Sequence, residues 1–178
     1  MSARLAASLA AYAAAIVAAN VMTANLGLVS VGFGLLVTAG TFAAGFALLA
    51  RDFVHRHGSA WWALLAIAVG AVASWLLATP QLALASTVAF AGAELVDLLI
   101  FVPLRKRHGF AVGAIGSNVV SAPLDTVLFL AIAGFPVTWP AVAGQFIGKV
   151  VWATLVPLSI YAGGRRALLR QPIDMAGA

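Results

Sequence analysis

Long apolar stretches alternate along the chain with short separators that contain polar residues, glycine or proline. A helix needs about 20 mostly apolar residues to cross the hydrocarbon core of a bilayer. Measured against that length, the pattern predicts six transmembrane helices, at residues 5–23, 29–50, 60–78, 82–104, 111–134 and 138–161. Because the separators are short, neighbouring helices must run antiparallel in one bundle, which leaves no room for a second domain.

The composition agrees with a protein that faces lipid. The chain is 63% hydrophobic and 8% charged, whereas a soluble domain carries about 25% charged residues. It contains no cysteine, which excludes disulfides, thiolate metal sites and cysteine nucleophiles. We therefore expect an all-α integral membrane protein, with residues 1–164 forming the six-helix transmembrane domain and residues 165–178 a short basic cytoplasmic tail.

The basic residues favour one side of this predicted bundle. Nine of the ten lie at the N-terminus, in the separators after the second and fourth helices, or in the tail: Arg4, Arg51, Arg56, Arg105, Lys106, Arg107, Arg165, Arg166 and Arg170. The other three separators contain no basic residue. By the positive-inside rule both termini are expected in the cytoplasm. The same distribution accounts for most of the net charge of +5, so we expect no nucleic-acid partner.

The first apolar stretch has an alternative interpretation. Residues 1–20 combine Arg4, an apolar run and small residues, as a secretory signal peptide does. The stretch is long, however, and contains no clear cleavage site. Counting it as a transmembrane helix also gives an even number of helices with a consistent charge pattern, and we favour that reading.

Polar side chains lie at similar depths in three consecutive predicted helices. They are Glu94 and Asp97 in the fourth helix, Asn118, Ser121 and Asp125 in the fifth, and Gln145 and Lys149 in the sixth. Within each helix the spacing of three, four or seven residues places them on one face. At a rise of about 1.5 Å per residue, all of them lie inside the hydrocarbon core. The pattern predicts one polar cavity between the fourth, fifth and sixth helices.

Two backbone features support a built site at this depth. Pro123 removes one hydrogen bond from the fifth helix, close to Asp125. Gly144 and Gly148 form a G-x-x-x-G pattern in the sixth helix, which lets a neighbouring helix approach closely.

The second predicted helix adds three residues. Thr41 is expected to face the cavity, and Arg51 and Asp52 to mark its cytoplasmic mouth, where they would form a gate.

The polar residues could instead be structural, holding the bundle together by hydrogen bonds and ion pairs. Charge counting argues against this for the whole set. Three carboxylates face one ammonium group, so at least one acid must be protonated, hydrated or bound by a ligand. Ionisable residues inside a membrane are functional candidates by default.

Catalysis is not expected. The histidines, His55, His57 and His108, are predicted to lie in cytoplasmic loops, far from the serines of the helices. No H-E-x-x-H pattern or glycine-rich nucleotide loop is present. His55 and His57 form an H-x-H pattern without a third ligand, so we expect no metal site and no cofactor.

Four segments together resemble the queuosine precursor transporter family, also called the vitamin uptake transporter or VUT family. They are AGTFAAGFALLARDFVHRHG, ASTVAFAGAELVDLLIFVPLRKR, SNVVSAPLDTVLFLAIAGF and GQFIGKVVWATLVPLSIY. The resemblance covers residues 38–161 and implies a transporter that imports 7-cyano-7-deazaguanine across the plasma membrane of a prokaryote. The positions that match the family are Asp52, Glu94, Asp97, Asn118, Asp125 and Lys149.

The implied substrate fits the predicted cavity. A deazaguanine presents a ring N–H and an exocyclic amine that one carboxylate can accept together, and we expect Glu94 or Asp97 to do so. Asp125 and Lys149 would form an ion pair or a proton-linked switch. The candidates for an aromatic wall are Phe90, Phe101, Phe129 and Trp152.

Two rival functions remain open at this point. The chain could be the substrate-capture subunit of a vitamin or nucleobase uptake system energised by a separate ATPase. It could also be a purely structural membrane protein. Because no ATPase is encoded here, we favour a carrier that works alone, either coupled to protons or facilitative. The sequence leaves open whether it forms a homodimer.

Overall fold

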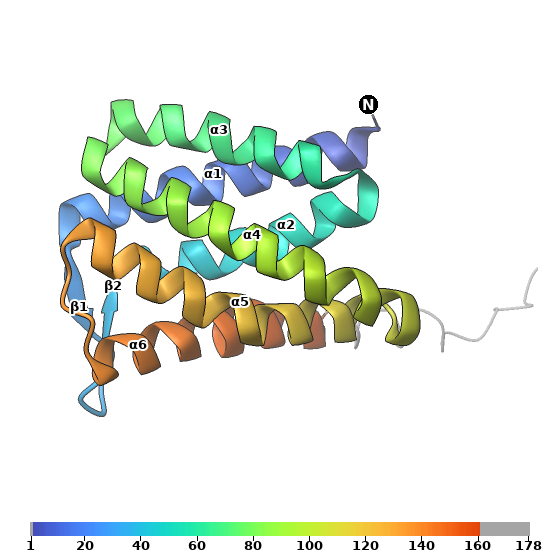
Figure 1. The fold of residues 1–178 in the computed structure, drawn as a ribbon. Coiled ribbons are helices and arrows are strands. Elements are labelled where there is room, and N and C mark those ends of the chain that lie inside the picture. The colour runs from blue at the N-terminus through green and yellow to red at the C-terminus, as the bar shows by residue number, and fades with distance from the viewer. Residues whose placement is uncertain (1, 161–178) are drawn as a thin grey trace, which may run out of the picture.

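The computed structural model describes residues 2–160 as a bundle of antiparallel helices with one small hairpin (Figure 1). This confirms the predicted all-helical bundle. The helices are α1 (Ala3–Leu26), α2 (Thr41–His57), α3 (Ala60–Leu77), α4 (Pro80–His108), α5 (Phe110–Ala133) and α6 (Trp139–Phe146), which continues as the π-helix η1 (Ile147–Leu155). The predicted tail and the predicted domain boundary at residue 164 lie outside the described residues.

A β-hairpin occupies nearly half of the segment predicted as the second helix, residues 29–38 of 29–50, and that part of the prediction was wrong. Strands β1 (Leu28–Ser30) and β2 (Leu36–Thr38) pair antiparallel, with Val29 opposite Val37. The turn between them places Gly32, Phe33 and Gly34 at positive φ, a conformation that no helix contains and that glycine adopts readily. Hydropathy alone could not separate this apolar hairpin from a helix.

Two helices extend further than predicted, into segments assigned to loops. Helix α2 continues through Arg51 to His57, and α4 continues to His108. Charged residues do not stop a helix, and glycine ends both: Gly58 N–H donates to the carbonyl of Val54, and Gly109 takes φ of 87°. All three histidines therefore lie in helices and not in loops.

The basic residues of the described helices lie at one end of the bundle, called here the basic end. Arg4 is in the first turn of α1, Arg56 in the last turn of α2, and Arg105 to Arg107 in the last turn of α4. Because the helices alternate in direction, these ends meet on the side where the chain begins (Figure 1).

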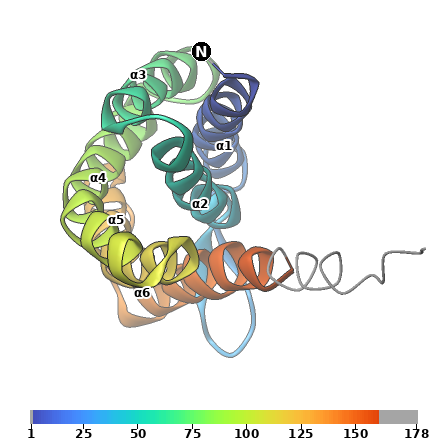
Figure 2. The same cartoon turned by 90° about the vertical axis from the view of Figure 1, so that its right-hand side faces the viewer.

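Helix α2 lies inside the bundle. Seen end-on, α1, α3, α4 and α5 curve around it (Figure 2), and most of its residues are buried. Five helical segments of the described chain are long and apolar enough to cross a membrane: α1, α3, α4, α5 and Trp139–Ile160. Helix α2 has only 17 residues and contains two buried charges. Enclosure by its neighbours explains how it tolerates them.

Glycine brings α2 and the hairpin onto the last helix. A Cβ added at Gly45 would lie 2.7 Å from Cα of Lys149, and one at Gly148 would lie 2.8 Å from Cγ2 of Thr41. Gly144 packs directly against the carbonyl of Leu36. The G-x-x-x-G pattern therefore does mark a close approach, and its partners are β2 and α2.

Candidate functional site

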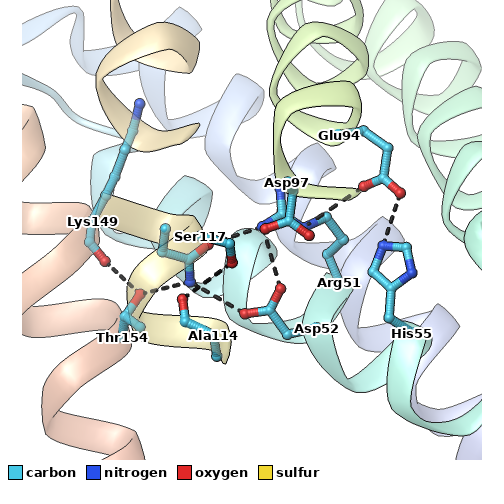
Figure 3. Close-up of polar contacts among 10 residues, drawn as sticks. Arg51, Asp52, His55, Glu94, Asp97, Ala114, Ser117, Lys149 and Thr154 are labelled. Carbon is cyan, nitrogen blue, oxygen red and sulfur yellow. Dashed lines mark hydrogen bonds and ion pairs between the residues drawn. The ribbon is translucent and has the colours of Figure 1, made fainter. Parts of the chain in front are cut away.

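A buried ionic network joins α2 to α4 and α5. We call it the Arg51 cluster, and it consists of Arg51, Asp52, His55, Glu94, Asp97 and Asn118 (Figure 3). Nη2 of Arg51 lies 2.5 Å from Oδ1 of Asp97 and 3.2 Å from Oδ1 of Asp52. It also donates to Oδ1 of Asn118 at 2.9 Å. Arg51 is 0% exposed, so this cation is enclosed by its partners.

Glu94 is held differently from the other two carboxylates. Its Oε2 lies 3.7 Å from Nε of Arg51, beyond hydrogen-bond length. Its Oε1 lies 2.8 Å from Nε2 of His55, a distance at which an ion pair forms if the ring is protonated. Both oxygens of Glu94 lack a hydrogen bond among the described residues. Glu94 therefore depends on His55 more than on Arg51.

A second ion pair lies on the last helix. Nζ of Lys149 donates to Oδ2 of Asp125 at 2.6 Å and to Oγ1 of Thr126 at 2.8 Å. Lys149 belongs to η1, the π-helical segment, and π-helical turns occur frequently at functional sites. This pair confirms that the predicted faces of the fifth and sixth helices meet.

Thr154 connects the two groups. Its Oγ1 accepts a hydrogen bond from Nδ2 of Asn118 at 3.3 Å and donates one to the backbone carbonyl of Lys149 at 2.9 Å (Figure 3). Asn118 in turn donates to Oδ2 of Asp52 at 3.3 Å. A chain of contacts thus runs from the Arg51 cluster through α5 to the backbone that carries Lys149.

A small cavity lies beside the Lys149–Asp125 pair. Its volume open to the centre of a water-sized sphere is about 20 Å³, which is room for about one water molecule. Its walls come from α1, β2, α2, α4, α5, α6 and η1: Ala19, Asn20, Thr23, Thr38, Gly40, Ala44, Ser86, Phe90, Asp125, Phe129, Gln145 and Lys149. The cavity is therefore central to the bundle and not confined to the last three helices.

Several polar atoms on the wall of this cavity have no hydrogen-bond partner among the described residues. Gln145 is 1% exposed, and both its amide atoms lack a hydrogen bond among the described residues. Nδ2 of Asn20 donates to Oγ of Ser74 and to Oγ of Ser86, while its Oδ1 has no hydrogen bond among the described residues. Buried polar groups normally have partners, and leaving one without costs about 1–3 kcal/mol. These atoms are therefore available to a ligand.

The structure divides the sequence-predicted residues between the cluster and the cavity. Asp125, Gln145, Lys149 and Phe90 line the cavity. Glu94, Asp97 and Asn118 belong to the Arg51 cluster, and Phe101 packs against His55 at 5.8 Å between ring centroids.

The remaining predicted residues are also buried. Ser121 has no hydrogen bond among the described residues, and Thr41 lies 3.1 Å from the hydroxyl of Thr38. Arg51 and Asp52, expected at the mouth, lie inside the bundle with 0% exposure.

Sequence reasoning missed the contribution of α1. Asn20 and Thr23 are buried polar residues in an otherwise apolar helix, and Ser86 is their counterpart on α4. The depth argument that selected Glu94 would have found Asn20 had it been applied to the first helix. It also missed Arg51 as a second buried cation, because the separator was expected to begin there.

The fold and these buried polar groups define a multi-pass membrane protein with an ionic interior and a central cavity. The model of the family described as "Putative vitamin uptake transporter" matches residues 6–163. The chain belongs to this family, which confirms the resemblance to VUT transporters and makes the protein a transporter. Comparisons with curated proteins and with solved structures gave no match.

Proposed function

We propose that the protein imports a 7-deazaguanine, with 7-cyano-7-deazaguanine as the leading candidate, through its central cavity. The observation that carries the proposal is the pairing of a buried, unpartnered amide with a buried ion pair on one cavity wall. Gln145 offers one donor and one acceptor that no described residue uses. Asp125 and Lys149 offer opposite charges beside it.

The polar edge of a deazaguanine suits this set of groups. Its ring N–H and exocyclic amine are neighbouring donors that a carboxylate accepts together. Asp125 takes this role in the proposal, since it lines the cavity whereas Glu94 and Asp97 contact Arg51. The carbonyl of the base would accept from Gln145 or Lys149.

Aromatic side chains supply the flat walls that a bicyclic base requires. Phe90 and Phe129 both line the cavity and are buried. Stacking on aromatic rings contributes about 1–3 kcal/mol per base in other nucleobase sites. Of the other aromatic candidates from the sequence, Phe101 packs in the cluster next to His55, and Trp152 is 60% exposed.

Binding requires the cavity to open, because about 20 Å³ cannot admit a bicyclic ring. The glycine contacts of Gly45 and Gly148 join α2 to η1 without interlocking side chains. Transporters alternate access by moving one group of helices against another around a central site. Movement at this contact would widen the cavity between Lys149 and the first helices.

The energy source in this proposal is the proton gradient. One proton moved across 100 mV supplies about 2.3 kcal/mol, which corresponds to about a 50-fold concentration ratio. We also propose that the protein lies in the plasma membrane of a prokaryote with both termini in the cytoplasm. The basic residues gathered at one end of the bundle support that orientation.

Thermal stabilisation of the detergent-purified protein by 7-cyano-7-deazaguanine tests the proposal, with guanine, adenine and riboflavin as controls. A ligand that binds only the folded state raises its stability, so a selective rise in the unfolding temperature is expected. No rise with any deazaguanine in a folded sample would refute the substrate assignment. Binding without uptake in vesicles that contain only this chain would instead favour a capture subunit energised by a separate ATPase.

A further inference from the structure

The Arg51 cluster carries more acid than base. It places three carboxylates, those of Asp52, Glu94 and Asp97, around the single guanidinium of Arg51. With His55 neutral the cluster has a net charge of −2, and with His55 protonated −1. All three carboxylates are at most 1% exposed. Unpaired buried charge is expensive in a membrane interior, so binding of a proton lowers the electrostatic cost of the cluster.

The contacts indicate where a proton would bind. Asp97 and Asp52 both contact Nη2 of Arg51, whereas Glu94 lies 3.7 Å from Nε. Glu94 is the carboxylate least stabilised by the guanidinium, and its nearest titratable partner is His55, 2.8 Å away. A proton bound by either member of this pair would lower the excess negative charge of the cluster from −2 to −1.

His55 also connects the cluster to the basic end. It lies in the last turn of α2 and is 9% exposed, more than Arg51, Asp52, Glu94 or Asp97. Histidine takes up and releases protons near neutral pH. It is therefore the member of the cluster best placed to exchange a proton with water at that end.

The charged and titratable groups around the pair come from three helices. Arg51 and Asp52 belong to α2, Asp97 to α4 and Tyr12 to α1. On α4, Arg105 donates from Nη1 to the carbonyl of His55 at 3.0 Å. Towards α5 and η1 the cluster meets the neutral side chains Asn118 and Thr154. Arg105 therefore joins the end of α4 to the backbone that carries His55.

Tyr12 of α1 is a further buried polar residue that packs against a residue of the cavity wall. It is 0% exposed, and its hydroxyl has no hydrogen bond among the described residues. Its ring meets Phe90, a cavity residue, edge-on at 6.3 Å. The contacts of Asn118 and Thr154 connect the Arg51 cluster to the backbone of Lys149, which lines the cavity.

We propose that His55 and Glu94 form the binding site of a co-transported proton, separate from the substrate cavity. The identity of the transported solute rests on the proposed function, whereas the assignment of the proton site does not depend on it. The substrate would bind at Asp125 and Lys149, and the proton at Glu94. Both would then act on the helices that Asn118 and Thr154 connect, and two ligands that shift the same conformational equilibrium are thermodynamically coupled.

Infrared difference spectroscopy between acidic and alkaline membrane samples tests the site without any substrate. A protonated-carboxyl band is expected in the wild type and in His57→Gln, and its loss in Glu94→Gln. His57 is a matched control, because it lies two residues from His55 on α2 and contacts Ser8 on α1 at 3.3 Å. An unchanged band in folded Glu94→Gln protein would overturn the proposal. His55→Gln provides a second variant, expected to shift the pH at which the band disappears.

Proton uptake on addition of 7-cyano-7-deazaguanine, followed with a pH dye in weakly buffered solution, tests the coupling. The wild type and His57→Gln are expected to take up about one proton per protein molecule, and Glu94→Gln none. Equal uptake by all three would overturn the proposal. If the wild type fails to bind the probe, the substrate assignment fails, and the infrared result still decides the proton site.

Discussion

Oγ1 of Thr154 donates a hydrogen bond to the carbonyl oxygen of Lys149, 2.9 Å away and five residues earlier in the chain. The wider turn of the π-helix η1 brings these two residues into register. Since the same hydroxyl accepts from Asn118, one side chain both closes the π-turn and binds α5. The orientation of Lys149 towards Asp125 therefore depends on Thr154.

Replacement of this threonine by valine keeps the shape of the side chain and removes both hydrogen bonds. We expect Thr154→Val to lower the free energy of unfolding by about 1 kcal/mol, measured by thermal unfolding in detergent. Thr87→Val is the control, because Thr87 donates only to the carbonyl of Ala83 within its own helix. Equal losses in the two variants would show that Thr154 has no special role.

The buried Lys149–Asp125 ion pair predicts that replacing one residue alone strongly destabilises the fold. Lys149→Met leaves the carboxylate of Asp125 buried without its cation, and removal of one partner from a buried pair costs about 3–5 kcal/mol. The double variant Lys149→Met, Asp125→Leu is expected to recover most of that loss, as judged by thermal unfolding. A double variant as unstable as the sum of the two single changes would contradict the buried pair.

Replacement of Gln145 is expected to weaken ligand binding with little loss of stability. Gln145→Leu removes an amide that no described residue bonds, so the fold loses nothing, while a ligand loses two hydrogen bonds. We expect binding of 7-cyano-7-deazaguanine to weaken about 10- to 100-fold, measured by calorimetry. Gln81→Leu serves as the control, since Gln81 is an exposed residue near the start of α4. Equal affinity in both variants would place the substrate elsewhere.

The proposed orientation can be read from chemical labelling, because the chain contains no cysteine. Single cysteines at Phe33, on the hairpin turn, and at Lys106, in the last turn of α4, mark the two ends of the bundle. In intact cells a membrane-impermeant maleimide is expected to label Phe33→Cys, and to label Lys106→Cys only after permeabilisation. The reverse pattern would place the basic end outside the cell.

The sequence predicted the faces of the helices better than their partners. Periodicity placed Glu94 and Asp97 on one face of α4, and the structure buries both against one cation. It could not identify that cation, because Arg51 lies 46 residues from Asp97 along the chain. Periodicity reports which side of a helix is polar, but contains no information on which other helix it meets.

The segments that escaped prediction share a physical cause. Hydropathy depends only on apolar content, so the segment that contains Val29 and Val37 was predicted as helix. The two residues in fact pair across a hairpin. The π-helical turn at Lys149 could not be predicted from hydropathy for a similar reason, since its residues are as apolar as those of an α-helix. Both elements are set by backbone geometry and by contacts with distant residues.

The hairpin also defines where the hydrocarbon of the membrane ends. Among the described strands, β1 and β2 pair only with each other, so their outer edges carry backbone groups that lipid cannot satisfy. A boundary on the helical side of Thr38, close to the first turn of α2, would keep these groups out of the hydrocarbon. Counting about 1.5 Å per residue from Thr41, Arg51 would then lie about 15 Å below that boundary. On this placement a guanidinium lies near the middle of the bilayer, where the transmembrane voltage would act on it directly.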